Sequence, residues 1–197
     1  DVIQHGTGRA ALKIGRDDLG GKTGTTNDAG NGGNTFTGAT VFNNSGSGYL
    51  MTGNGAADQF LSTATFNNSG SSVIYVAHSH SLLTTTFSGA VTINNTSTSS
   101  SGNPGVRFAE SGVSSIVTFN STVNVNNGGT GNGNTISFAP SNNGNIINFN
   151  STVNVVQNNS GTSGTTLFGG TATINLNDNI VVSNTSGNNS YIGFTLN

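Results

Sequence analysis

The chain of 197 residues contains no cysteine and no tryptophan, and only 6% of its residues are charged, against about 25% in an average soluble domain. The lack of cysteine excludes disulfide bonds and thiolate metal sites. Phosphate binding needs clustered basic side chains, and no lysine occurs after residue 28, so nucleic acid is excluded as a partner. No apolar run reaches the ~20 residues of a membrane-spanning helix, and we therefore expect no membrane span.

The residues that replace charge are glycine, asparagine, serine and threonine, together with eleven phenylalanines. Intrinsic disorder usually combines low hydrophobicity with high net charge and much proline. Here the net charge is −2 and there are two prolines, while β-branched residues are abundant. The composition therefore favours a repetitive β structure over disorder.

A seven-residue unit recurs six times, with apolar residues at its first, fifth and seventh positions, except for Thr40 at the fifth position of the first copy. Its copies begin at Phe36, Phe60, Phe87, Phe119, Phe149 and Leu176, at intervals that average 28 residues. Alternation with period two predicts that each unit is one strand with a buried face and a polar face. A second apolar cluster follows each copy, and runs rich in Gly, Asn and Ser separate the clusters as turns.

A unit of this length cannot bury its apolar side alone, whereas coils stacked about 4.8 Å apart form a continuous core. We therefore predict an all-β fold, a parallel β-solenoid of about six coils over residues 35–197, after an N-terminal segment and linker at 1–34. A β-sandwich is the rival, but its short antiparallel hairpins fit these variable loops less well. The first positions of the six units are expected to form an interior ladder of structural core residues.

Asparagine pairs follow five consecutive units at a nearly constant offset. They are Asn43-Asn44, Asn67-Asn68, Asn94-Asn95, Asn126-Asn127 and Asn158-Asn159. Asparagines at matching positions of successive coils can stack their amides along the axis. The alternative interpretation is that they are turn residues that tolerate left-handed backbone angles.

The alternation and the Asn/Gly/Thr richness of residues 35–197 resemble the repeat regions of bacterial surface adhesins, autotransporter passengers and large secreted β-strand-repeat proteins. The resemblance implies an extracellular or bacterial cell-surface location. It also implies adhesion, self-association or a surface stalk as the function, with a surface or glycan ligand as a partner.

Residues 1–28 carry most of the charge and are similar to the stretch of class A penicillin-binding proteins that ends in Lys22-Thr23-Gly24. The resemblance implies a strand lining a transpeptidase site. A Ser-x-x-Lys nucleophile is missing, because Ala10 and Leu19 stand three residues before the lysines, so we expect no acylation. The same stretch fails as a phosphate-binding loop, since Gly15 is one position too far from Gly21.

Few residues beyond this segment are candidates for chemistry. His78 and His80 lie on one face of an extended segment but lack a third ligand for a metal. A polysaccharide-active β-helix would need paired carboxylates, and the acids available are Asp58, Glu110 and Asp178, with Arg107 able to pair with Glu110. An ice-binding threonine array would use Thr63, Thr65, Thr122 and Thr152, but Ala39, Val41, Ala90 and Asn179 interrupt it.

We therefore predict a non-catalytic structural protein, a self-associating filament subunit or adhesin repeat region, with no catalytic residue, metal ligand or cofactor. Ice binding and polysaccharide cleavage are the alternatives. A surface with so little charge cannot oppose association by repulsion. The edges expected to mediate assembly contain Phe36 and Phe42 at one end and Tyr191, Ile192, Phe194 and Leu196 at the other.

Overall fold

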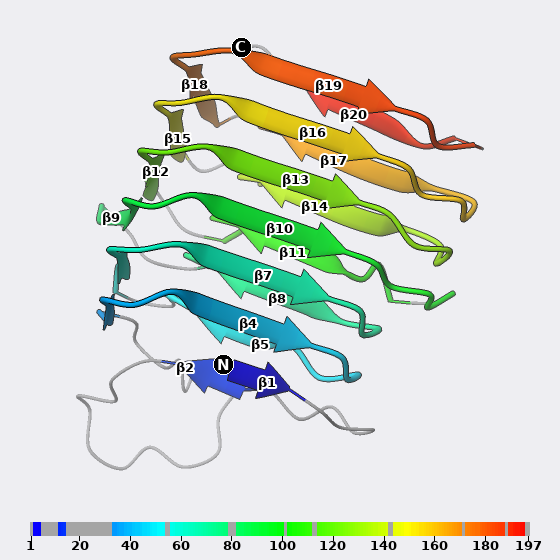
Figure 1. Cartoon of the computed structure of the whole chain (residues 1–197), viewed down its shortest axis with the longest axis horizontal. Coiled ribbons are helices and arrows are strands. Elements are labelled where there is room, and N and C mark those ends of the chain that lie inside the picture. The colour runs from blue at the N-terminus through cyan, green and yellow to red at the C-terminus, as the bar shows by residue number, and fades with distance from the viewer. Residues whose placement is uncertain are drawn as a thin grey trace.

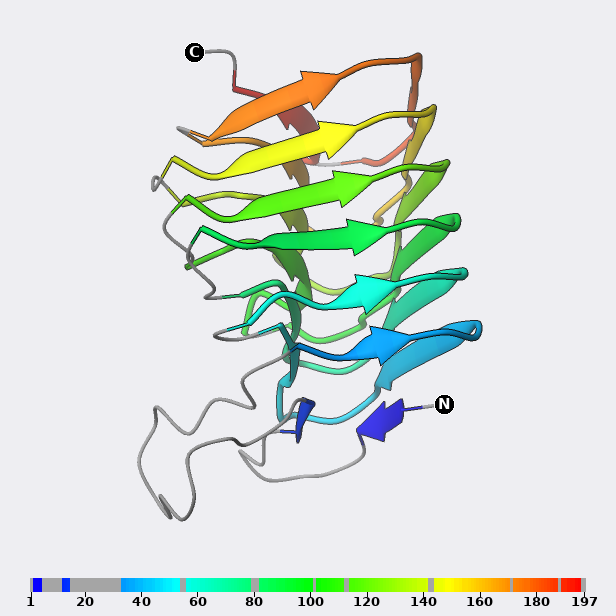
Figure 2. The same ribbon diagram turned by 90° about the vertical axis from the view of Figure 1, so that its left-hand side faces the viewer.

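The computed structural model describes residues 2–4, 12–14, 33–53, 56–78, 82–100, 102–111, 114–141, 144–170, 172–187 and 189–195. The described chain winds repeatedly around one axis and forms three parallel sheets (Figures 1 and 2). The predicted all-β parallel solenoid is thus confirmed. No helix long and apolar enough to cross a membrane occurs in these residues.

The three sheets, here called A, B and C, take successive strands from each turn of the chain. Sheet A consists of β1 (Val2–Gln4), β4 (Thr40–Asn44), β7 (Ala64–Asn68), β10 (Val91–Asn95), β13 (Val123–Asn127), β16 (Val153–Gln157) and β19 (Ile180–Asn184). Sheet B consists of β2 (Leu12–Ile14), β5 (Leu50–Thr52), β8 (Val73–Val76), β11 (Gly105–Phe108), β14 (Asn134–Phe138), β17 (Gly164–Phe168) and β20 (Tyr191–Phe194). Sheet C consists of β3 (Thr35–Phe36), β6 (Gln59–Phe60), β9 (Thr84–Phe87), β12 (Ile116–Phe119), β15 (Ile146–Phe149) and β18 (Thr173–Leu176).

Two stacks of phenylalanine rings run through the interior. The predicted ladder from Phe36 to Phe149 is present on sheet C, with successive ring centroids 4.7, 4.4, 4.9 and 5.0 Å apart, and Leu176 follows Phe149 in register. A second stack on sheet B joins Phe108, Phe138, Phe168 and Phe194 at 5.0, 4.9 and 4.8 Å. Rings of the two stacks meet edge to face, the geometry that their quadrupoles favour.

The seven-residue unit is not a single strand, contrary to our expectation. Phe119 ends β12 in sheet C and Val123 begins β13 in sheet A, with residues 120–122 forming the corner between them. In a straight strand the third position would point into the core together with the first and fifth. The bend instead leaves the Ser121 side chain partly exposed, so the hydroxyl needs no partner in the core.

The N-terminal segment contributes two strands that we expected to lie outside the solenoid. β1 pairs with β4, with Val2 opposite Phe42, and β2 pairs with β5, with Leu12 opposite Leu50. Sheets A and B therefore extend into residues 1–34. Lys22-Thr23-Gly24, Ala10, Leu19 and Gly15 lie outside the described residues.

Asparagine amides form ladders inside and outside sheet A. On the outer face Asn67 donates to Asn43, Asn94 to Asn67 and Asn126 to Asn94, each at 2.8 Å. Inside, Asn68 donates to Asn95 and Asn95 to Asn127, both at 3.1 Å. The outer ladder thus includes the first residue of all four pairs up to Asn126-Asn127, whereas the inner ladder begins at Asn68, because Nδ2 of Asn44 has no hydrogen-bond partner among the described residues. The fifth assignment was wrong, because Val156 and Gln157, not Asn158 and Asn159, align with Asn126 and Asn127.

Candidate functional site

A small group of charged and aromatic side chains lies on the outer face of sheet B, on an otherwise almost uncharged solenoid. Tyr75 on β8 and Arg107 on β11 are register partners. Their strand neighbours, such as Ile74 and Val106, are fully buried in the core, and alternation along a strand therefore turns Tyr75 and Arg107 outward. With Tyr49, His78 and Glu110 they form a set that we call the sheet B cluster.

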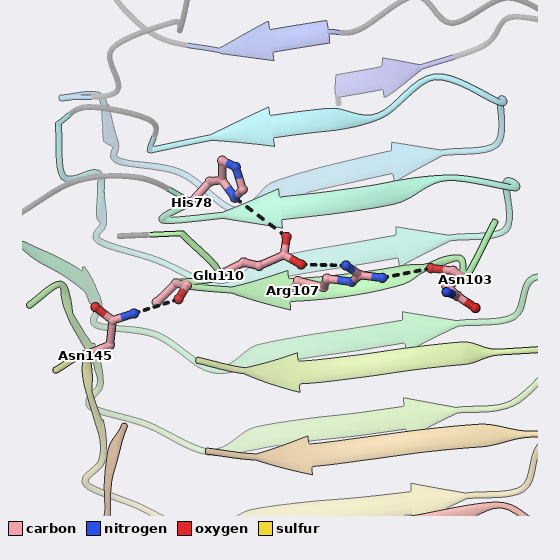
Figure 3. Close-up of polar contacts among 6 residues, drawn as sticks. His78, Asn103, Arg107, Glu110 and Asn145 are labelled. Carbon is pink, nitrogen blue, oxygen red and sulfur yellow. Dashed lines mark hydrogen bonds and ion pairs between the residues drawn. The ribbon is translucent and has the colours of Figure 1, made fainter. Parts of the chain in front are cut away.

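The ionic part of this cluster joins three segments of the chain (Figure 3). The Arg107 guanidinium donates to Glu110 Oε1 at 2.5 Å and to the Asn103 carbonyl oxygen at 3.2 Å. Glu110 Oε2 lies 3.8 Å from Nδ1 of His78 in the preceding coil. The pairing of Arg107 with Glu110 was anticipated from their spacing, whereas the approach of His78 depends on the stacking of coils.

The aromatic part extends toward the start of sheet B. The Tyr75 ring lies 4.5 Å from the His78 ring between centroids, in a tilted arrangement. The Tyr49 ring meets Tyr75 edge to face at 5.8 Å. Both tyrosines are half-buried, so each presents part of its ring to solvent.

Burial sets the protonation of the cluster. It lowers the pKa of His78, against the opposing effect of the nearby Glu110 carboxylate, and Arg107 adds to the lowering. Burial also raises the pKa of Tyr75, and the Glu110 charge adds to this. The imidazole and the phenol are therefore neutral at pH 7, and the Arg107 and Glu110 charges compensate each other.

The three carboxylates among the described residues have separate partners. Asp58 is buried at the start of β6, where Oδ1 accepts hydrogen bonds from the backbone and side-chain nitrogens of Asn34, both at 2.9 Å, and Oδ2 accepts one from Thr52. Asp178 is exposed at the corner between sheets C and A and accepts a bond from Thr152 at 3.1 Å. Glu110 faces outward beside sheet B. Each of the three acids thus serves its own local contacts.

A metal site is not formed by the described residues, which contain no group of three or more His, Asp or Glu side chains able to hold an ion. His80, which we expected to lie on the same face as His78 without a third ligand, lies outside the described residues.

The four threonines considered for an ice-binding array lie in two different parts of the solenoid. Thr65 lies on the outer face of sheet A, in a column that continues through Thr92 to Asn124. Thr63, Thr122 and Thr152 lie in the corners between sheets C and A. The structure therefore separates Thr65 from the other three residues of the proposed array.

A shallow groove lies where stacked loops lead from sheet A to sheet B. It has a volume of about 400 Å³ and is lined by the Ser-Gly-Ser triplets at 45–47 and 69–71 and by Thr98 and Ser99. The triplets stack through backbone bonds from the Ser69 and Gly70 amides to the Asn44 carbonyl and from Ser71 to Gly46. A Cβ at Gly70 would lie 2.2 Å from the Gly46 oxygen, so only glycine permits this close stacking.

The predicted assembly edges are only partly exposed. Phe42 was wrongly assigned, because it is fully buried in the core, and its strand is paired on both sides. Phe36 is partly buried against the core on β3, the first strand of sheet C. On β20, Tyr191 is 54% and Phe194 40% exposed, while Ile192 packs partly against the core. Leu196 lies outside the described residues, and the exposed Val182 on β19 was not anticipated from the sequence.

Comparison with protein-family models, with curated proteins and with solved structures gives no match for this chain.

Proposed function

We propose that this chain is a non-catalytic structural β-solenoid that associates end to end with further copies of itself, as a filament subunit or adhesin repeat region outside a bacterial cell. Its described surface offers no paired carboxylates and no metal-ligand group. Its interior, by contrast, repeats one pattern of contacts from coil to coil. The repeated residues therefore serve contacts between stacked coils rather than a reactive centre.

The single observation that carries the proposal is the state of the coil formed by β18, β19 and β20. Leu176, Val182 and Phe194 occupy the same register positions as buried residues of the preceding coil, yet they are 37%, 45% and 40% exposed. The outer edges of these three strands pair with no described strand. Open edges of this kind are templates for pairing with another chain.

Either a continuation of the same chain or a second copy fits this edge, and we propose the second copy. A further parallel coil would cover the three apolar side chains and satisfy the backbone groups of the three strand edges at once. The near absence of charge in residues 29–197 removes the repulsion that ordinarily keeps such edges apart.

Sedimentation velocity and electron microscopy over a range of concentrations test the proposal. We expect the purified chain to form elongated oligomers, and Val182→Lys to abolish them, because a lysine would place an unpaired charge in the new interface. Val181→Lys is the matched control, since Val181 is the preceding residue on β19 and points outward. Dispersed monomers at every concentration, or equal loss of assembly in both variants, would contradict the proposal.

A further inference from the structure

We propose that the outer face of sheet A is a lateral contact between copies of this chain, in which two solenoids lie side by side. This face consists of the outward residues of β4, β7, β10, β13, β16 and β19, which alternate with core residues such as Phe66, Ile93 and Val125. In Figure 1 these strands lie at the front, and no other described segment covers them. The inference rests on end-to-end association but concerns a different surface from the β18–β20 edge.

The outer face of sheet A carries no charge. Its outward positions, from Val41 on β4 to Ser183 on β19, hold only valine, threonine, serine and asparagine. Two such faces can meet without repulsion and without removing a charge from water. Side chains of this size also allow two flat sheets to approach closely, as in the interfaces between paired sheets of stacked strands.

Asparagine amides make this face complementary to a copy of itself. Asn94 donates to Asn67 and accepts from Asn126. In a second column, Asn154 donates to Asn124 at 2.9 Å. An amide can donate twice and accept twice, so one ladder bond in each direction leaves it able to bond outward. Because an identical face has the same groups at the same coil spacing, it can meet these amides in register.

The outer faces of the other two sheets fit such a contact less well. Sheet B carries the ion pair of Arg107 and Glu110, and a copy placed over it would have to cover these charges. Sheet C has an amide column through Asn148 and Asn175, but its strands have only two to four residues, whereas β4–β19 of sheet A have five each. Sheet A therefore offers the widest uncharged face among the described residues.

The size of this face links lateral contact to end-to-end association. Six strands about 4.8 Å apart and about 16 Å long span roughly 450 Å², so two copies would together bury about 900 Å². Stable specific interfaces bury about 1,200–2,000 Å². One pair of chains falls short of this, whereas copies joined end to end present the face repeatedly and add their contacts. We therefore expect paired filaments rather than paired single chains.

Electron microscopy of the full chain, with sedimentation velocity at matched concentrations, tests the inference. We expect elongated particles that lie in pairs. Thr92→Lys should keep their length but lower the share of paired particles about tenfold or more, because it places a charge near the centre of the face. Thr86→Lys is the matched control and should pair like the native chain, since Thr86 is a half-buried threonine of the same coil that faces outward on sheet C. Val181→Lys, on the last strand of the sheet A face, should elongate normally but pair less.

Thermal melts establish that each variant remains folded, and Thr65→Lys on the neighbouring strand β7 is a second variant that should lose pairing. Elongated native particles of single width would overturn the sheet A contact. Pairing that survives Thr92→Lys, or that is lost equally in Thr86→Lys, would overturn it as well.

Failure of end-to-end association gives a different result. Compact native dimers that never elongate, and that Thr92→Lys disperses, would contradict the proposed function while supporting the sheet A contact. Dispersed native monomers at every concentration would overturn both.

Discussion

The coil of β15, β16 and β17 and the coil of β18, β19 and β20 have the same apolar pattern but very different burial. Phe149, Val155 and Phe168 are essentially inaccessible, whereas their register partners Leu176, Val182 and Phe194 are each more than one-third exposed. The burial differs because the coil of β15, β16 and β17 has a neighbouring coil on both sides, whereas the coil of β18, β19 and β20 has a described neighbour on one side only. The core of this solenoid is therefore a property of contacts between coils, and a single coil cannot provide it.

The largest expected effect is on the phenylalanine stack of sheet B. Phe168→Ala should lower the free energy of unfolding by about 3–5 kcal/mol, because it removes a fully buried ring between two others. Phe194→Ala, in the same stack but 40% exposed, should cost clearly less. Denaturant unfolding of the two variants, at a concentration where the chain is monomeric, measures the contrast. Equal losses would contradict the role that we give to the neighbouring coil.

The interior column of side-chain amides should show the same contrast between covered and exposed positions, with smaller losses in the free energy of unfolding. Asn127 is fully buried, and its amide donates to the Asn134 and Thr165 carbonyls and to Gln157 Oε1. Asn127→Ala should cost about 1–3 kcal/mol, since buried partners are left without a hydrogen bond. Asn184→Ala, at the exposed end of the same column, should cost less than about 0.5 kcal/mol. A loss at Asn184 as large as that at Asn127 would overturn this interpretation of the ladder.

Asp58 offers a pH-dependent test of the covered part of the core. Burial raises the pKa of this carboxyl above its usual value of 3.8, so the folded state binds the proton more tightly than the unfolded state. Its contribution to stability is therefore fully present below pH 3.8 and is lost as the pH rises through the folded pKa. Asp58→Asn should remove this decline in stability between acidic and neutral pH. Asp178→Asn, at an exposed position, should retain it in the same thermal melts.

His78 should give the smallest effect, of opposite sign. Because burial lowers its pKa below 6.5, the unfolded state binds the proton more tightly, and stability should fall as the pH drops through 6.5. His78→Gln should flatten this part of the pH profile of the melting temperature. An unchanged slope between pH 7 and pH 5 would show that the folded protein does not disfavour the charged imidazole.

The sequence predicted the solenoid fold and the phenylalanine ladder of sheet C, because the first position of each unit is strongly apolar and recurs once per turn. It did not reveal the corner inside each unit, since spacing alone cannot distinguish a straight strand from a bend after Phe119. Nor did it align Gln157 with Asn127. In the sequence, Asn158-Asn159 resembles the earlier asparagine pairs. In the structure, the side-chain amide at the matching position belongs to Gln157.

The sheet B cluster illustrates a second limit. Arg107 and Glu110 are three residues apart, so their pairing could be anticipated, whereas His78 and Glu110 are separated by 32 residues. Coil lengths vary between 24 and 32 residues along the chain, as the intervals between repeats show. The residue that stacks on a given position therefore depends on loop lengths that composition does not determine. The groove was missed for the same reason, because its lining comes from three separate loops.

The most direct test of end-to-end association is amide hydrogen exchange measured at low and at high protein concentration. If a second copy covers the last coil, the backbone amides of β18, β19 and β20 should become more protected as concentration rises and approach the protection of β15, β16 and β17. The Val182→Lys variant should not show this gain. Exchange in β18–β20 that is fast and independent of concentration would contradict end-to-end association.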